Sequence, residues 1–143
     1  MRKLLTVCLG NHCRSPLAQT ALTRRGGAAV KVRSAGLIGK WEDRPAHPSM
    51  IEAARRLGLD LTPHRGRQIT PEMVAWADEV LAMDATVLGA LQAVCGEEYA
   101  HKIRLYLPGR DVPDPIGQDD GTYFDCAVLI DAGTALHLGS LLK

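Results

Sequence analysis

Four short runs rich in β-branched residues and leucine, separated by stretches with helical spacing, constrain the fold of this chain more than any other feature. The runs span residues 4–8, 30–34, 79–83 and 103–107. Short apolar runs of this kind are typical of strands that are buried on both faces of a parallel sheet. Because strands alternate with helices along the chain, the pattern predicts an α/β fold with helices on both faces of the sheet.

The intervening stretches predict five helices, over residues 16–25, 48–57, 71–76, 87–94 and 123–142. Gly26 follows the first helix as a typical stop, and Pro48 suits the first turn of the second. Thr70 is the expected N-cap of the third helix. Residues 39–48 and 108–121 are irregular and are expected to form loops.

Length and composition favour one domain over residues 1–143, large enough to fold without disulfides or a structural metal. The formal net charge of +1 gives no general attraction to nucleic acid or to an anionic membrane. No apolar stretch approaches the roughly 18 residues of a membrane span, and no export segment develops near Met1. We expect a cytoplasmic protein with no nucleic-acid partner and no membrane insertion. The sequence leaves the oligomeric state open, with a monomer favoured.

The four cysteines are Cys8, Cys13, Cys95 and Cys126. A reducing cytosol would keep them as thiols. A zinc site needs two close pairs of Cys or His, and only Cys8 and Cys13 are near each other, so no metal site is expected. Cys95 and Cys126 are expected to be structural.

The loop after the first predicted strand carries the strongest functional signal. It reads Val7-Cys8-Leu9-Gly10-Asn11-His12-Cys13-Arg14-Ser15-Pro16. Ligands of parallel α/β sheets gather at the carboxyl ends of the strands. A tight loop that leads from a strand into a helix directs backbone N–H groups and the helix N-terminus at one point, which favours an anion. The same field is expected to stabilise a thiolate at Cys8.

Arg14 and Ser15 complete this arrangement. Arg14 lies six positions after Cys8, so a curled loop can bring its guanidinium to the far side of a tetrahedral anion, where its fork bonds two oxygens at once. The Ser15 hydroxyl can hydrogen-bond the thiolate. The expected phosphate-binding residues are therefore Leu9, Gly10, Asn11, His12, Cys13, Arg14 and Ser15.

The decapeptide resembles the signature of the low-molecular-weight protein tyrosine phosphatase family, which runs Val-Cys-x-Gly-Asn-x-Cys-Arg-Ser-Pro at the N-terminus. Further matching segments, at residues 34–37, 64–70, 81–84 and 112–115, extend the resemblance along nearly the whole chain. The middle segments look most like the bacterial branch. The resemblance implies a flavodoxin-like, phosphotyrosine phosphatase I-like fold, a three-layer, doubly wound, four-stranded parallel sheet with flanking helices.

The resemblance also implies hydrolysis of phosphotyrosine on proteins, without metal or cofactor. Cys8 would form a cysteinyl-phosphate intermediate, and Arg14 would clamp the phosphate. Asp114 would protonate the leaving group and then deprotonate water. An aspartate beside proline is also a common turn former, and Asp111 is the only nearby substitute as a general acid.

Supporting residues follow from the same resemblance. Asn11, Ser15, Ser34 and His64 would form a hydrogen-bond network that holds the phosphate loop. Asparagine suits a left-handed backbone there. Cys13 would form a reversible disulfide with Cys8 and protect it from over-oxidation. The implied partner is a phosphotyrosine protein, with a bacterial tyrosine autokinase of polysaccharide export as one candidate.

The expected wall of the substrate pocket departs from the family pattern. Ile116 follows Pro115 where an aromatic residue is usual, and His12 replaces a branched aliphatic residue. Trp41 lies in a charged loop and is the main candidate to replace the missing aromatic, with Tyr123 and Phe124 as further candidates. The expected wall is Trp41, His12 and Ile116.

Three alternative functions stay open. His12 and the missing aromatic allow a protein arginine phosphatase. A thiol-dependent arsenate reductase shares the loop but needs a close pair of later cysteines, and Cys95 and Cys126 are 31 positions apart. A non-catalytic phosphate-binding module would not need both a thiol and an acid.

Overall fold

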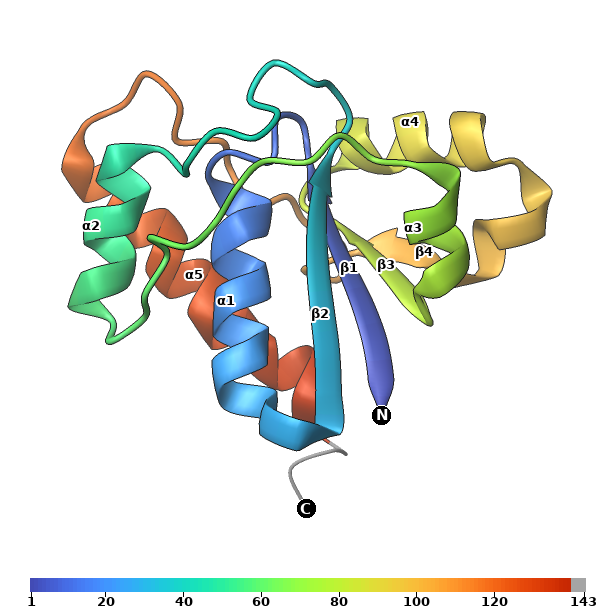
Figure 1. Ribbon diagram of the computed structural model, residues 1–143, viewed down its shortest axis with the longest axis horizontal. Helices are drawn as coiled ribbons and strands as arrows, with labels where there is room; N and C mark the ends of the chain where they lie inside the picture. The colour runs from blue at the N-terminus through green and yellow to red at the C-terminus, as the bar shows by residue number, and fades with distance from the viewer. Residues whose placement is uncertain (140–143) are drawn as a thin grey trace.

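The computed structural model describes residues 1–139 of the chain. Its strands form one sheet in the order β2-β1-β3-β4, and every neighbouring pair is parallel (Figure 1). The strands are β1 (Arg2–Cys8), β2 (Val30–Gly36), β3 (Glu79–Ala82) and β4 (Ile103–Leu105). The prediction of a four-stranded parallel α/β sheet is confirmed.

Helices cover both faces of this sheet. They are α1 (Arg14–Gly26), α2 (Pro48–Arg56), α3 (Pro71–Trp76), α4 (Ala85–Cys95) and α5 (Asp120–Leu138), with short 3₁₀ turns η1 (Gly27–Ala29) and η2 (Glu97–Lys102). Figure 1 shows α1, α2 and α5 on one side and α3 and α4 on the other. The final helix begins earlier than expected because Asp119 accepts a hydrogen bond from the Thr122 N–H and caps it. The expected helical positions 140–142 lie outside the described residues.

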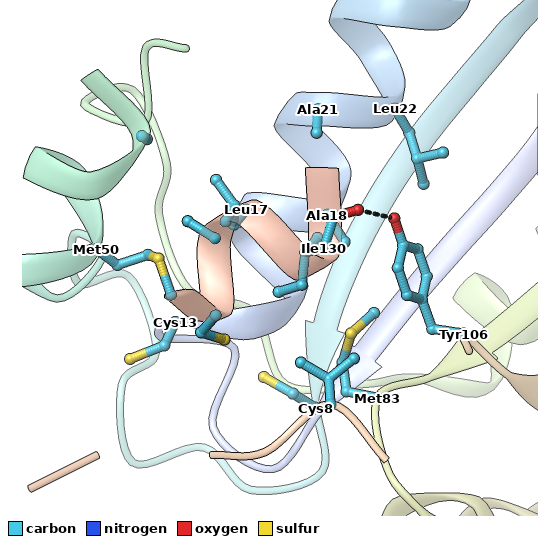
Figure 2. Packing of buried hydrophobic residues seen from close by; sticks show 14 of the residues in the cluster. Cys8, Cys13, Leu17, Ala18, Ala21, Leu22, Met50, Met83, Tyr106 and Ile130 are labelled. Carbon is cyan, nitrogen blue, oxygen red and sulfur yellow. Dashed lines mark hydrogen bonds between the residues drawn. The ribbon is translucent and has the colours of Figure 1, made fainter. Parts of the chain in front are cut away.

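The two faces of the sheet bury separate cores, because neighbouring side chains of a strand point to opposite faces. Leu4 belongs to the core under α1, α2 and α5, whereas Leu5 belongs to the core under α3 and α4. Figure 2 shows part of the first core, where the Tyr106 hydroxyl donates a 2.7 Å hydrogen bond to the Ile130 carbonyl. Cys8 and Cys13 belong to this same core. Within residues 1–139, no helix combines the length and the apolar character needed to cross a bilayer.

The loop after β1 closes tightly over the end of β2. Cys8 pairs with Gly36 in the sheet register. A Cβ atom at Gly36 would lie 2.7 Å from the Gly10 carbonyl carbon and 2.8 Å from the Asn11 nitrogen, closer than a side chain tolerates. Glycine at position 36 therefore lets the loop pack directly on the neighbouring strand.

Candidate active site

A cavity of about 160 Å³ opens at the carboxyl end of β1. Residues from three separate segments line it. These are the loop after β1 with the first residue of α1, residues 38–41, and the loop that contains Asp114 and Ile116. The lining residues are Cys8, Leu9, Gly10, His12, Cys13, Arg14, Ile38, Lys40, Trp41, Asp114 and Ile116. The structure thus brings Cys8, Arg14 and Asp114 together, although more than a hundred positions separate the first from the last.

Two polar groups approach the Cys8 sulfur. The Asn11 N–H donates to Sγ at 3.2 Å, and the Ser15 hydroxyl lies 3.0 Å from Sγ. The Ser15 hydroxyl also lies 3.3 Å from the Ala35 carbonyl, which accepts its proton when it is not turned to the sulfur. The sulfur thus accepts a hydrogen bond from the loop backbone and lies within hydrogen-bond distance of a hydroxyl.

Asn11 is the residue on which the loop turns. Its φ of 54° lies in the left-handed region, which asparagine tolerates better than most residues. Its side-chain Nδ2 donates to both Ser15 Oγ and Ser34 Oγ at 2.9 Å. Its Oδ1 accepts from the Arg67 N–H at 2.8 Å. Both amide donors and the amide oxygen of Asn11 are therefore hydrogen-bonded, which holds the left-handed turn.

His64 also contacts this turn. Its Nε2 lies 3.0 Å from the Asn11 carbonyl oxygen. Burial lowers the pKa of His64, the hydrogen bond to Asn11 raises it in part, and Arg65 and Arg67 lower it further. Asn11, Ser15, Ser34 and His64 thus lie in one hydrogen-bonded group. Sequence reasoning did not find Arg67, which takes part through its backbone N–H.

The Arg14 side chain is buried and held from behind. Its Nη1 donates to Asp84 Oδ2 at 2.7 Å and to the Val112 carbonyl at 2.8 Å. Its Nη2 lies 3.7 Å from Asp114 Oδ2. Burial alone would lower the pKa of Arg14, but the hydrogen bond to Asp84 and the negative charges of Cys8 and Asp114 raise it above its ordinary value. Arg14 therefore remains a cation.

Asp84 is a site residue that sequence reasoning missed. It follows β3, the strand beside β1, and its Oδ1 accepts from the Val87 N–H as the N-cap of α4. Burial would raise the pKa of Asp84, but hydrogen bonds from Val87 and Arg14 lower it below its ordinary value. Its position in the sequence could have indicated this role, because residues that follow neighbouring parallel strands lie at the same edge of the sheet, where ligands bind.

Asp114 combines a turn with a position on the cavity. Its Oδ1 accepts from the Ile116 N–H at 3.1 Å, as in an ordinary aspartate turn, and its side chain is 44% exposed. Its other oxygen, Oδ2, points toward Arg14. Asp111 does not line the cavity and instead accepts a hydrogen bond from the Ala85 N–H at 2.9 Å. The structure therefore places Asp114, and not Asp111, beside Cys8.

The aromatic side of the cavity is built from His12 and Trp41. Their rings are parallel within 4°, with centroids 3.9 Å apart. Trp41 also packs on Gly10, where a Cβ atom would lie 2.8 Å from the indole. Burial, followed by the charge of nearby His47, lowers the pKa of His12 to about 4. His12 is therefore a neutral backing for the Trp41 ring at neutral pH.

The rest of the wall is aliphatic and basic. Ile116 is 48% exposed, and Ile38 and Lys40, which sequence reasoning did not propose, complete this side of the cavity. Tyr123 does not line the cavity, because it is buried on α5 and stacks on His47 with ring centroids 4.7 Å apart. Phe124 is likewise absent from the lining and packs under the Arg56 guanidinium.

All four cysteines are free thiols. Burial, followed by the charge of Cys8, raises the pKa of Cys13, so Cys13 stays protonated beside the cavity. Cys126 is buried in the same core, and burial raises its pKa to about 12. Cys95 packs against the core on the opposite face of the sheet. Its separation from Cys126 by the sheet leaves no close pair of later thiols.

Comparison with known proteins identifies the family to which this chain belongs. A family model described as low molecular weight phosphotyrosine protein phosphatase matches residues 3–142. The chain belongs to this family. The resemblance found in the loop after β1 is thereby confirmed over almost the full length.

Similar low molecular weight phosphatases come from several bacteria. The probable low molecular weight protein-tyrosine-phosphatase EpsP of Ralstonia solanacearum is 35% identical over 134 residues, which is 93% of this chain and 91% of EpsP. Vibrio vulnificus Wzb, solved in complex with benzylphosphonate, superposes with a TM-score of 0.90 at 28% identity and covers 97% of this chain and 98% of its own.

A third similar structure is a cysteine-to-serine variant of the YwlE arginine phosphatase with a phosphorylated active-site serine. It is 29% identical to this chain, with a TM-score of 0.88 over 99% of this chain and 96% of its own. Proteins of similar fold thus include a phosphatase named for arginine as well as those named for tyrosine.

Proposed function

We propose that this chain hydrolyses phosphotyrosine on proteins by way of a cysteinyl-phosphate intermediate. The observation that carries the proposal is the meeting of three groups in one small cavity. These are the Cys8 sulfur beside the Asn11 N–H and the Ser15 hydroxyl, the buried Arg14 guanidinium, and the Asp114 carboxyl 3.7 Å from Arg14. Together they provide a nucleophile, an anion clamp and an acid.

In the first step the Cys8 thiolate attacks phosphorus, the S–P bond forms, and the bond from phosphorus to the aryl oxygen breaks. Asp114 gives its proton to the departing oxygen. The Arg14 fork binds two of the equatorial oxygens and, with the loop N–H groups, stabilises the charge that they carry in the transition state. The Ser15 hydroxyl hydrogen-bonds the sulfur before attack.

In the second step a water attacks phosphorus and gives its proton to the Asp114 carboxylate. The P–S bond breaks, inorganic phosphate leaves, and Cys8 returns as a thiolate. The residues that hold Asn11 keep the loop in shape through both steps. Cys13, buried next to the cavity, is proposed as the thiol that forms a disulfide with oxidised Cys8.

Two neighbours support this chemistry. Wzb was solved with benzylphosphonate, in which an aromatic ring is joined to a phosphate-like group. The YwlE variant carries a phosphoryl group on the serine that replaces its cysteine. By analogy, we place the aromatic ring of the substrate against Trp41 and the transferred phosphoryl group on Cys8.

A protein arginine phosphatase is the second candidate. It is favoured by Ile116, which leaves the side of the cavity after Pro115 without an aromatic ring. Trp41 favours phosphotyrosine as the substrate more strongly, because packing of the substrate ring against the indole would stabilise the complex by about 1 kcal/mol. The phosphotyrosine partner is proposed as a class. An autokinase of polysaccharide export, a cytoplasmic location and a monomeric state stay predictions from the sequence.

The test compares peptides that carry phosphotyrosine, phosphoarginine or phosphoserine, in EDTA, for the wild type, Cys8→Ser and Asp114→Ala. We expect phosphotyrosine to have the highest kcat/KM and Cys8→Ser to be inactive on all three. Asp114→Ala should lose a hundred- to ten-thousand-fold on phosphotyrosine. It should lose much less on 4-nitrophenyl phosphate, whose leaving group needs less protonation. A preference for phosphoarginine would establish the second candidate instead.

A further inference from the structure

A second cavity, of about 460 Å³, lies behind the phosphate loop at the open edge of the sheet. It is an open hollow lined by residues of α1, of the edge strand β2, of the segment that joins α2 to α3, and by Met73 of α3. Figure 1 shows the joining segment crossing α1 and β2. The residues that matter for its chemistry are Arg33, Arg65, Arg67, Ser34 and His64. Of these, Ser34, His64 and Arg67 also contact Asn11.

The charges around this cavity are unbalanced. Three arginine residues line it, against one acidic residue, Asp60, whose carboxylate is already hydrogen-bonded to the Thr62 N–H and hydroxyl. Arg65 also donates to the Thr62 and His64 carbonyls, and Arg67 to the Gly66 carbonyl. Among the described residues, neither Arg33 nor Arg65 forms an ion pair, and Arg67 has only a 3.4 Å contact with Asp43 on the surface. The Arg33 guanidinium lies 5.2 Å from the centre of the Trp76 ring of α3.

We propose that this cavity binds the phosphate group of a small organic phosphate ester. Guanidinium forks match the oxygens of phosphate, and an excess of two positive charges in a concave site matches its charge of about two. The volume exceeds what a phosphate ion alone would fill, so it has room for an organic part of the ligand.

The site is coupled to the phosphate loop through Asn11. Because the positive charges of Arg65 and Arg67 help to lower the pKa of His64, an anion beside them favours the protonated ring. A protonated His64 donates a stronger, charge-assisted hydrogen bond to the Asn11 carbonyl. The occupant therefore tightens the left-handed turn, and by linkage it strengthens binding of phosphate-like groups at Cys8.

The test follows the His64 ring by NMR while the protein is saturated with vanadate, a phosphate mimic that occupies the cavity at Cys8. Glucose 6-phosphate, inorganic phosphate and glucose are titrated separately, and His64→Gln assigns the signal. The wild type should show a saturable shift with glucose 6-phosphate. A double variant, Arg33→Gln with Arg65→Gln, should weaken the apparent affinity at least tenfold. Lys31→Gln, an exposed charge on the same strand outside the cavity, should stay within twofold.

Each other outcome contradicts part of the proposal. A shift that does not saturate, or that is equal in all variants, would mean charge screening and no site. Equal or tighter binding of inorganic phosphate would remove the organic ester as the ligand. In a separate assay of 4-nitrophenyl phosphate hydrolysis, which rests on the proposed function, glucose 6-phosphate should lower KM about threefold in the wild type and not in the double variant. Saturable binding with an unchanged KM would refute the coupling alone.

Discussion

Arg14 and Asp84 form the ion pair that fixes the cation of the site, with Nη1 and Oδ2 2.7 Å apart. Arg14 is the first residue of α1, which follows β1. Asp84 lies just after the end of β3, the strand next to β1. The pair exists because the strand order brings the two loops together. Val112, from the loop that carries Asp114, accepts a second hydrogen bond from the same nitrogen. One guanidinium thus joins the start of α1, the loop after β3 and the loop that carries Asp114.

Asp84→Asn is expected to lower kcat/KM for an aryl phosphate about ten- to a hundredfold, the usual value of a hydrogen bond to a charged group. Asparagine caps a helix as well as aspartate does, so the melting temperature should change little. Asp119→Asn, the same substitution at the N-cap of α5, is the control and should keep full activity. An Asp84→Asn enzyme as fast as the wild type would show that Arg14 needs no charged partner.

Substitutions of Asn11 separate its backbone role from its side-chain role. Asn11→Gly and Asn11→Ala both lose the three side-chain hydrogen bonds, but only alanine must also bear the left-handed conformation. Alanine should therefore be the less stable of the two by about 1 kcal/mol in urea unfolding. Equal stabilities would mean that the loop abandons its turn once the amide is lost.

Much of this architecture follows from local sequence. The apolar runs place the strands because strands buried on both faces must be apolar throughout. The loop after β1 is predictable because Cys8, Arg14 and Ser15 lie within one short segment. The role of Asp84 was not predicted, because its partner Arg14 is 70 positions away in the sequence. Only the strand order β2-β1-β3-β4 brings the two residues together.

Other features of the site were not predicted because they depend on side-chain packing. His47 caps α2 with a ring nitrogen, Nδ1, which accepts from the Ser49 N–H, a role that residue preferences do not assign to histidine. The parallel stack of His12 on Trp41 depends on the path of residues 37–47, a loop with no periodic pattern. Tyr123 is a buried residue within α5, which begins at Asp120, three residues before the predicted start.

His12 is expected to make stability depend on pH in the acid range. Its pKa is lowered to about 4 in the folded chain, so between about pH 6.5 and pH 4 the unfolded chain takes up a proton at His12 that the folded chain does not. The free energy of unfolding therefore falls as the pH decreases through this window, by on the order of 2 kcal/mol from this group.

Urea unfolding of His12→Leu between pH 7 and pH 4 measures this contribution. The variant should lose less stability over that range than the wild type, while His101→Gln, at an exposed position, should follow the wild type. His64 and His137 also have lowered pKa values and contribute equally in both proteins. Parallel curves for wild type and His12→Leu would show that His12 titrates normally.

Trp41→Leu tests the aromatic wall. We expect KM for an aryl phosphate to rise about fivefold, which corresponds to roughly 1 kcal/mol of lost ring packing, with little change for an alkyl phosphate. Trp76→Phe, on the opposite face of the sheet, serves as the control. If both substrates respond equally, Trp41 shapes the cavity without recognising the ring.

Direct detection of the phosphorylated thiol tests the central claim that Cys8 is the nucleophile. Asp114→Ala should accumulate the intermediate from 4-nitrophenyl phosphate, because the base for its hydrolysis is missing. After rapid quenching in denaturant, mass spectrometry of the peptide that spans Cys8 should show one added phosphoryl group. The group should persist when Cys13→Ser is added and disappear when Cys8→Ala is added. A phosphoryl group that survives Cys8→Ala, or that disappears with Cys13→Ser, would contradict the mechanism.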